Sequence, residues 1–193
     1  MIRARKLSKR FGDKRVLEGL DLEVPRAGFV LVTGPNGSGK TTLLRLCAGL
    51  AAPTDGELEV DAARGAIGFL AHEPLVYREL TALENLDLYG RLYRLPERRE
   101  RAGAMLERFG LWRARNERVA TFSRGMLQRL ALCRTFLHDP DLLLLDEPFD
   151  GLDAEGVELL HAELAERSAA TALVATHDPK SLAGRATARI ALA

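Results

Sequence analysis

A glycine-rich octapeptide, GPNGSGKT at residues 34–41, constrains the fold of this sequence more than any other feature. It matches the pattern G-x-x-x-x-G-K-[ST], and it lies between the apolar run FVLVT and a helical pattern that begins at Lys40. Glycines at these positions let the backbone wrap around a polyphosphate, and N–H groups at the start of the helix attract negative charge. The sequence therefore predicts a strand, a phosphate-binding loop and a helix in direct succession.

Each part of this loop has an expected role in binding a nucleoside triphosphate and Mg²⁺. Lys40 is expected to reach the β and γ phosphates, and the hydroxyl of Thr41 is expected to bind the metal ion. The loop residues predicted to bind the nucleotide are Gly34, Pro35, Asn36, Gly37, Ser38, Gly39, Lys40, Thr41 and Thr42. A chance glycine-rich turn is the alternative, but the flanking strand and helix patterns favour a P-loop nucleoside triphosphatase.

A second motif, LLLLDEP at residues 142–148, predicts the acidic half of the same site. Four apolar residues followed by an acid are typical of a buried strand that delivers a carboxylate, here Asp146, to Mg²⁺. Glu147 follows directly and is expected to orient and deprotonate the attacking water. The alternative is that both acids cap the next helix, but their place at the end of an all-leucine strand favours the catalytic interpretation.

Short apolar runs alternate with helical periods along the chain. The expected strands are 20–24, 29–33, 66–71, 142–145, 171–176 and 188–193, and the expected helices are 40–50, 81–93, 101–111, 126–137 and 155–167. Several of the runs are apolar on both faces, as central parallel strands must be, so the pattern predicts an α/β sheet protein. The stretch from about residue 74 to 140 has helical patterns and no convincing strand, which suggests a helical subdomain inserted into the sheet domain.

The composition is that of an ordinary globular chain. Of the 193 residues, 47% are apolar and 28% are charged, and the formal net charge of +1 gives no sign of a nucleic-acid-binding surface. No apolar run approaches the roughly 18 residues of a membrane span; a role at a membrane therefore requires another chain. Cys47 and Cys133 lie in apolar patterns, which predicts buried free thiols in a reducing compartment. The arginine-rich run 91–103 is either a solvated helix face or a partner-binding surface.

The segment FSRGM at residues 122–126, which is followed by the pair QR, resembles the LSGGQ signature of ABC-type ATPases. It departs from that consensus at two positions, where Arg124 replaces the first glycine and Met126 replaces the glutamine. Ser123 and Gly125 are retained, so the resemblance implies that the hydroxyl and the helix N-terminus still face a nucleotide. Whether Arg124 adds charge near the phosphates or points into solvent is left open by the sequence.

Other motifs of the same family stand in the expected order, and the resemblance covers essentially the whole chain. Phe11 precedes the phosphate-binding loop at the distance of the aromatic residue that stacks on adenine. The segment DGLD, which ends at Asp153, is similar to the D-loop, whose residues adjoin the nucleotide, and His177 in ATHD is similar to the switch histidine, a catalytic residue. The resemblance thus implies ATP and Mg²⁺ as cofactors.

The resemblance also implies an architecture and partners. The expected fold is α/β, a RecA-like P-loop sheet core with an antiparallel β subdomain and an inserted helical subdomain. Residues 1–73 and 141–193 are expected to form the core, and residues 74–140 the helical subdomain with the signature. In this family two copies face each other and sandwich two ATP molecules, which implies a homodimer. Transmembrane transporter subunits are expected as partners at the cytoplasmic face of the cell membrane, and nucleic acid is not.

His72, in the stretch FLAHEP, occupies the position of the family's glutamine that touches Mg²⁺ and the attacking water. A neutral imidazole can accept a hydrogen bond from that water or meet the metal through its lone pair. Because Mg²⁺ prefers oxygen ligands, we expect an outer-shell role. The alternative is a plain loop histidine. His138 and His161 are interpreted as structural.

The pattern H-x-P at this position, followed by LTALENL, resembles the ATP-binding subunit of the haem exporter used in cytochrome c biogenesis. The segments SRGM and LYGRLYRLP also resemble the wider group of ABC-2-type exporters of drugs, lipids or polysaccharides. Non-transport ABC ATPases of DNA repair, condensation or translation are a more distant alternative, because they usually carry coiled-coil or zinc insertions or two fused ATPase domains. The expected activity is ATP hydrolysis that powers export, with haem as the expected cargo.

Overall fold

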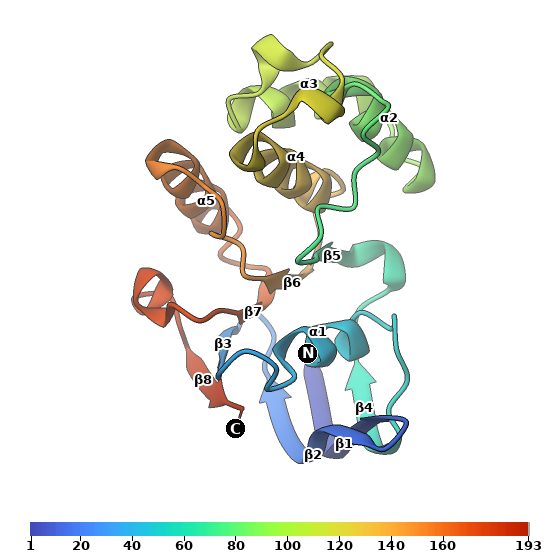
Figure 1. The fold of residues 1–193 in the computed structure, drawn as a ribbon, viewed down its shortest axis with the longest axis vertical. Coiled ribbons are helices and arrows are strands. Elements are labelled where there is room, and N and C mark those ends of the chain that lie inside the picture. Colours follow the sequence, from blue (N-terminus) through green and yellow to red (C-terminus); the bar gives the residue numbers. More distant parts are fainter. Residues whose placement is uncertain (193) are drawn as a thin grey trace. The chain divides into compact units, whose positions relative to one another are not determined.

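The computed structural model describes residues 1–192. Five parallel strands form the larger of its two sheets (Figure 1). Their spatial order is β5 (Ile67–Leu70), β6 (Leu142–Asp146), β7 (Thr171–Ala175), β3 (Phe29–Thr33) and β8 (Ala188–Ala191). Strands β6 and β7 are buried at every residue, as strands covered on both faces must be. Each of the predicted runs 29–33, 66–71, 142–145, 171–176 and 188–193 contains one strand of this sheet, and among the described residues the strand ends differ from the predicted ones by at most one residue. Residue 193 lies outside the described residues.

The parallel arrangement decides where functional side chains gather. Parallel strands end at the same edge of a sheet, and ligands of open α/β sheets bind outside that edge. The ends of four strands deliver the phosphate-binding loop after β3, His72 after β5, Asp146 and Glu147 at β6, and His177 after β7. Segments far apart in the sequence thus emerge along one edge.

A second sheet is antiparallel and has the order β2-β1-β4. Its strands are β1 (Ile2–Phe11), β2 (Lys14–Val24) and β4 (Asp55–Val60). The sequence pattern predicted only residues 20–24 of this sheet. The rest was missed because charged residues alternate with the buried ones, so that Ile2, Ala4 and Leu7 never form a continuous apolar run.

Both sheets share one hydrophobic core with helix α1 (Lys40–Cys47). Leu43, Leu44 and Leu46 of α1 are buried in it, together with residues of the parallel strands and of the antiparallel sheet. Cys47 is buried as predicted, and burial raises the pKa of its thiol to about 12. This core holds the helix that follows the phosphate-binding loop against two sheets.

The chain divides into two compact units. The first unit contains both sheets and comprises Met1–His72, Asp141–Glu147 and the segment that begins at Ala169. The second unit comprises Glu73–Pro140 and Pro148–Ser168. The second unit thus contains residues 74–140, which were predicted to form the helical subdomain. It also contains residues 148–168, which were predicted to belong to the sheet core.

Four helices make up most of the second unit: α2 (Ala82–Leu92), α3 (Arg98–Arg108), α4 (Arg124–Phe136) and α5 (Ala154–Glu166). Helix α2 begins with a capping box, in which the hydroxyl of Thr81 accepts from the N–H of Glu84 and the carboxylate of Glu84 accepts from the N–H of Thr81. Helix α3 starts and ends three residues earlier than predicted, and its end is explained by Gly110, which has a φ of +69°.

Ion pairs explain why α5 belongs to the helical unit. Glu163 of α5 has a fully buried side chain and accepts from Arg108 of α3 at 2.8 Å. Arg129 of α4 forms ion pairs with Asp153 and Glu155 at the start of α5. A buried carboxylate is tolerated only when it is paired, so these contacts fix α5 to its neighbours.

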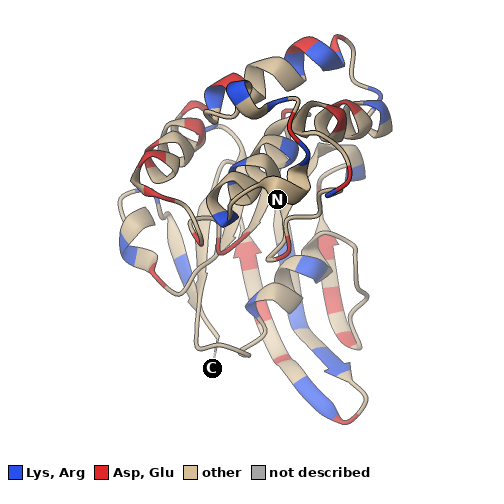
Figure 2. Cartoon of the chain, turned by 45° about the horizontal axis from the view of Figure 1, so that its top comes forward, with Lys and Arg blue, Asp and Glu red and all other residues tan. Residues whose placement is uncertain are grey.

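The remaining regular elements are short 3₁₀ helices, at Arg64–Ala66, Trp112–Ala114, Val119–Thr121 and Pro179–Leu182. Basic and acidic residues are interspersed along the helices and the strands (Figure 2). Over residues 1–192, every helix is too short or too polar to cross a membrane.

Candidate nucleotide-binding site

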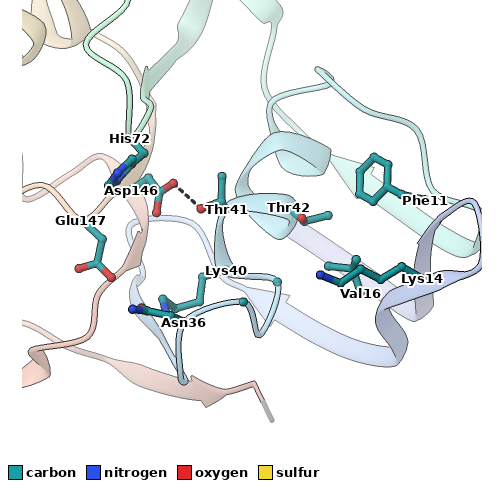
Figure 3. A pocket seen from close by; sticks show the side chains of 12 residues that line it. Phe11, Lys14, Val16, Asn36, Lys40, Thr41, Thr42, His72, Asp146 and Glu147 are labelled. Carbon is teal, nitrogen blue, oxygen red and sulfur yellow. Dashed lines mark hydrogen bonds between the residues drawn. The ribbon is translucent and has the colours of Figure 1, made fainter.

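A cavity of about 560 Å³ lies in the first unit at the phosphate-binding loop (Figure 3). Its lining residues are Phe11, Lys14, Val16, Asn36, Gly37, Gly39, Lys40, Thr41, Thr42, His72, Asp146 and Glu147. Ten of these twelve were singled out from the sequence, and they come from positions as far apart as 11 and 147. The remaining loop candidates, Gly34, Pro35 and Ser38, belong to the loop but do not line the cavity.

The phosphate-binding loop has a conformation that requires glycine. Gly39, which precedes α1, has a φ of +98°, and a Cβ atom there would lie 2.9 Å from the carbonyl oxygen of Val16. Gly34 has a φ of +151°, and a Cβ atom would lie 2.6 Å from Oγ of Ser38. Side chains at these positions would force the loop open, and the N–H groups would no longer converge.

Lys40 is held inside the loop by backbone carbonyl groups. Its Nζ donates to the carbonyl oxygens of Gly34 at 2.8 Å and Pro35 at 3.2 Å, and the residue is only 7% exposed. Both partners are neutral, so the positive charge of Lys40 is available to an anion that enters the cavity. This geometry fits a phosphate group.

Asp146 and Thr41 form the oxygen-rich side of the cavity (Figure 3). The hydroxyl of Thr41 donates to Oδ2 of Asp146 at 2.7 Å. Burial raises the pKa of Asp146, and the nearby carboxylate of Glu147 raises it further, whereas Thr41, His72 and Lys40 act in the opposite direction. A carboxylate that is costly to ionise in its site gains from a bound cation. The hydroxyl and the carboxylate are ligands that Mg²⁺ uses beside substrate phosphates, so this pair fits that metal.

Glu147 and His177 meet at the same edge of the sheet. Oε2 of Glu147 accepts from the backbone N–H of His177 at 3.1 Å and lies 2.8 Å from Nδ1 of its ring. Glu147 adopts a φ of +47°, a left-handed conformation that costs a non-glycine residue about 1 kcal/mol or more, and its N–H donates to the carbonyl of Ala175. This conformation holds the carboxylate beside the histidine.

His72 is exposed and lines the cavity on the side of Asp146 and Glu147 (Figure 3). It follows the last residue of β5 by two positions, so the strand fixes where its backbone enters the site. The structure therefore brings His72 to the acids, as the sequence position predicted, while its part in the chemistry remains a proposal.

Phe11 ends β1 and is 55% exposed on the cavity wall. Lys9 lies with its Nζ 4.9 Å from the centre of the Phe11 ring. Lys14 and Val16 of β2 line the same wall and were missed from the sequence. The short turn between residues 11 and 14 could have predicted them, because it pairs the start of β2 with Phe11.

The signature residues lie in the second unit. The hydroxyl of Ser123 caps α4 by accepting from the N–H of Met126 at 3.2 Å. Arg124 donates to Asp150 at 2.6 Å. Asp153 caps α5 through the N–H of Gly156 at 2.9 Å, and Gly125 lies in the first turn of α4. All four expected residues thus belong to the start of a helix or to the loop next to it.

Residues 17–150 match the family model described as "ABC transporter". The chain belongs to the ABC transporter family. Its fold is that of the ABC ATPase cassette, as predicted: it superimposes on a solved ATP-binding subunit of an ABC transporter with a TM-score of 0.90 and 29% identity, covering 99% of this chain and 85% of that one. A dimeric post-hydrolysis ATP-binding cassette bound to ADP and Pi gives a TM-score of 0.87 and 30% identity, covering 100% and 94%.

Relatives with different transport roles have similar sequences. The daunorubicin resistance ATP-binding protein of Streptomyces coeruleorubidus is 43% identical over 159 residues, which is 77% of this chain and 50% of that protein. An aliphatic sulfonates import ATP-binding protein of Burkholderia ambifaria is 41% identical, covering 89% of this chain and 54% of the relative. The ABC transporter ATP-binding protein NatA of Bacillus subtilis is 38% identical, covering 79% and 69%. This member of the family thus spans 50% to 69% of the length of these three proteins.

Proposed function

We propose that this chain binds and hydrolyses MgATP as the ATP-binding subunit of an ABC transporter. The observation that carries the proposal is a single cavity in which Lys40, the Thr41–Asp146 pair and Glu147 come together. Family membership and the likeness to a cassette that holds ADP and Pi support ATP as the nucleotide.

Each side chain of the cavity has its own role in binding MgATP and in hydrolysis. Phe11 stacks on the adenine, and the N–H groups of residues 34–42 hold the phosphates together with Lys40. Thr41 and Asp146 would hold Mg²⁺, which would supply positive charge that offsets the charge of the phosphates. His72 would orient the attacking water without binding the metal directly.

Glu147 acts as the general base. It takes a proton from a water molecule as the water oxygen bonds to the γ phosphorus, and the bond from that phosphorus to the bridging oxygen breaks, so that ADP and phosphate leave. His177 holds the carboxylate of Glu147 through two contacts to one oxygen and thereby limits its rotation.

Two copies of the chain form the working unit. The dimeric cassettes among the similar structures support a sandwich in which Ser123 and Gly125 of one copy face the ATP of the other. Transmembrane subunits at the cytoplasmic face of the membrane receive the motion that accompanies closure and release. No nucleic acid takes part.

The change Glu147→Gln tests this proposal. It keeps the phosphate-binding loop and removes the base, so hydrolysis should fall about 100-fold or more while MgATP still binds. Size-exclusion chromatography with MgATP should then show an ATP-dependent dimer. A variant that hydrolyses ATP at the wild-type rate would contradict the assignment of the base, and a monomer at every MgATP concentration, also with membrane subunits present, would contradict the sandwich.

We propose haem export for cytochrome c biogenesis as the transport reaction. The pattern H-x-P at His72 and the segment LTALENL, in which Thr81 caps α2, support this choice. The relative named for daunorubicin resistance favours drug export as the second candidate. The complex purified from membranes with its partner subunits should show ATP hydrolysis that is stimulated by haem and not by daunorubicin; the reverse pattern would assign the chain to a drug exporter.

A further inference from the structure

Within the second unit, helix α4 contacts the loop that precedes α5, residues 148–153, through three side chains. Nε2 of Gln128 donates to the carbonyl oxygen of Pro148 at 3.1 Å. Arg129 pairs with Asp153 at the far end of the loop. Between these two, Nη2 of Arg124 donates to Oδ2 of Asp150 at 2.6 Å. The signature helix and residues 148–153 are therefore attached to each other along the whole loop.

Arg124 lies directly on the loop. Gly151 has a φ of +76°, and a Cβ atom there would lie 3.0 Å from both Cγ and Nε of Arg124. A Cβ atom on Gly125 would lie 3.2 Å from the carbonyl oxygen of Gly151. The side chain of Arg124 thus crosses over a glycine to reach Asp150, and a larger residue at position 151, where φ is positive, would be strained and would crowd that side chain.

The charge of Arg124 needs an anion where it stands. It is the first residue of α4, and the first turn of the helix contains no acidic residue. A cation at a helix N-terminus is unfavourable because the backbone dipole is positive there. Asp150 supplies the opposing charge, which explains why the guanidinium turns to the loop.

The three contacts differ in strength. The side chain of Arg129 is only 8% exposed, whereas the side chains of Arg124 and Asp150 are 74% and 38% exposed. Exposed ion pairs are weak and are screened by salt. The ion pair of Arg124 and Asp150 is therefore the contact of the loop that salt can weaken. The contacts of Gln128 and Arg129 come from buried side chains and are less sensitive to salt.

We propose that Arg124 is a positioning residue for hydrolysis that acts through Asp150. The loop that it holds begins at Pro148, the residue after the base Glu147, so a fixed loop restrains where the carboxylate of Glu147 can lie. The replacement of a signature glycine by arginine thereby attaches the signature helix to the loop that follows the base in the chain. This inference rests on the proposed ATP hydrolysis and adds a residue to it.

A double-mutant cycle tests the positioning role. The variants are Arg124→Met, Asp150→Asn and the combination of both, with Arg124→Lys as the conservative variant. Each single neutral change should lower kcat by about three- to fivefold, the size of an exposed ion pair, and leave KM for MgATP within about twofold. The combined variant should be no slower than the singles, and Arg124→Lys should retain most of the rate.

Salt and a matched variant provide the controls. Raising the ionic strength should slow the wild type toward the rate of Arg124→Met, while that variant changes less. Arg26→Met breaks an exposed ion pair of the same 2.6 Å length, with Asp61, in the first unit and should behave as wild type. Asp150→Asn removes the charge with little change of shape, and it tests the pair if Arg124→Met does not fold.

The outcomes separate this inference from the proposed function. A rise in KM for Arg124→Met with no effect of Asp150→Asn would mean that Arg124 contacts the phosphates, and the positioning role would be wrong. Unchanged kcat in all variants of a wild type that hydrolyses MgATP would also overturn it alone. A folded wild type without any hydrolysis would overturn the proposed function and this role together.

Discussion

The phosphate-binding cavity and the signature segment differ in what neutralises their charged side chains. In the cavity, Lys40 meets two carbonyl oxygens and Asp146 meets the hydroxyl of Thr41, so buried charges face neutral groups. Around α4, the charge of Arg129 is met by the carboxylates of Asp153 and Glu155.

This difference indicates which charged residues bind a ligand and which ones stabilise the fold. A buried charge with neutral partners is incompletely compensated, and it gains when an oppositely charged ligand arrives. A charge that already has carboxylate partners gains little from a ligand and mainly holds the fold. Substitutions in the cavity should therefore act on ligand binding and hydrolysis, and substitutions at the buried ion pairs of α4 should act on stability.

The largest effect is expected for Lys40→Ala. Charge-assisted hydrogen bonds to phosphate are lost, so the affinity for MgATP should fall about 100-fold, while the thermal stability of the nucleotide-free chain changes little. Isothermal titration calorimetry measures the affinity. Arg45→Ala, an exposed change on the same helix, is the control and should bind as wild type. Equal affinity of both variants would remove Lys40 from the site.

Asp146→Asn should raise the stability of the chain and abolish its hydrolysis of ATP. Burial raises the pKa of Asp146, so its ionised form costs stability, and the amide should raise Tm of the nucleotide-free chain by about 2–4 °C at neutral pH. The cost is fully present above the raised folded-state pKa and decreases between that pKa and the lower pKa of the unfolded chain, so the advantage of the amide should shrink on acidification. Hydrolysis dependent on Mg²⁺ should be lost.

Differential scanning calorimetry from neutral to acidic pH measures this difference. Asp141→Asn, an exposed change near the start of the same strand, serves as the control and should leave Tm unchanged. If Asp146→Asn is less stable than wild type at neutral pH, the carboxylate holds the fold and the comparison between the two regions fails.

Arg129→Met should show the opposite pattern in the second unit. The change removes the ion pairs with two carboxylates that water can still reach, so the expected loss is about 1–2 kcal/mol of unfolding free energy. Urea unfolding measures this loss, with the exposed pair broken by Arg26→Met as the control. Affinity for MgATP should stay within about twofold of wild type. A large loss of affinity at wild-type stability would give Arg129 a role in binding.

The smallest effect is expected for His72→Gln. The amide oxygen can accept a hydrogen bond from the same water as a neutral imidazole, so most of the hydrolysis rate should remain. His72→Ala removes the acceptor and should lower kcat by about fivefold, the size of one hydrogen bond. Steady-state kinetics of the three proteins measure the difference. An alanine variant as fast as wild type would reduce His72 to a loop residue without a catalytic part.

Local spacing carried most of the site prediction. The strand, glycine loop and helix around Lys40 follow one another within a few residues, so one short segment contains the glycines and the helix N-terminus that bind phosphate. Asp146 at the end of an all-leucine run is similar, because a buried strand must end with its polar residue at the edge of the sheet. Both were predicted from the sequence, and the structure brings both to the cavity.

Residue pairs that are distant in sequence come together only in the tertiary structure. Thr41 and Asp146 are 105 residues apart, and Glu147 and His177 are 30 residues apart, so only the order of the parallel strands brings each pair together. The family resemblance predicted the antiparallel sheet, but the sequence pattern located only residues 20–24 of it, because charged residues alternate with the buried ones along its strands. The sequence left open where Arg124 points, because its direction depends on Asp150, which lies 26 residues away on a loop held by α4.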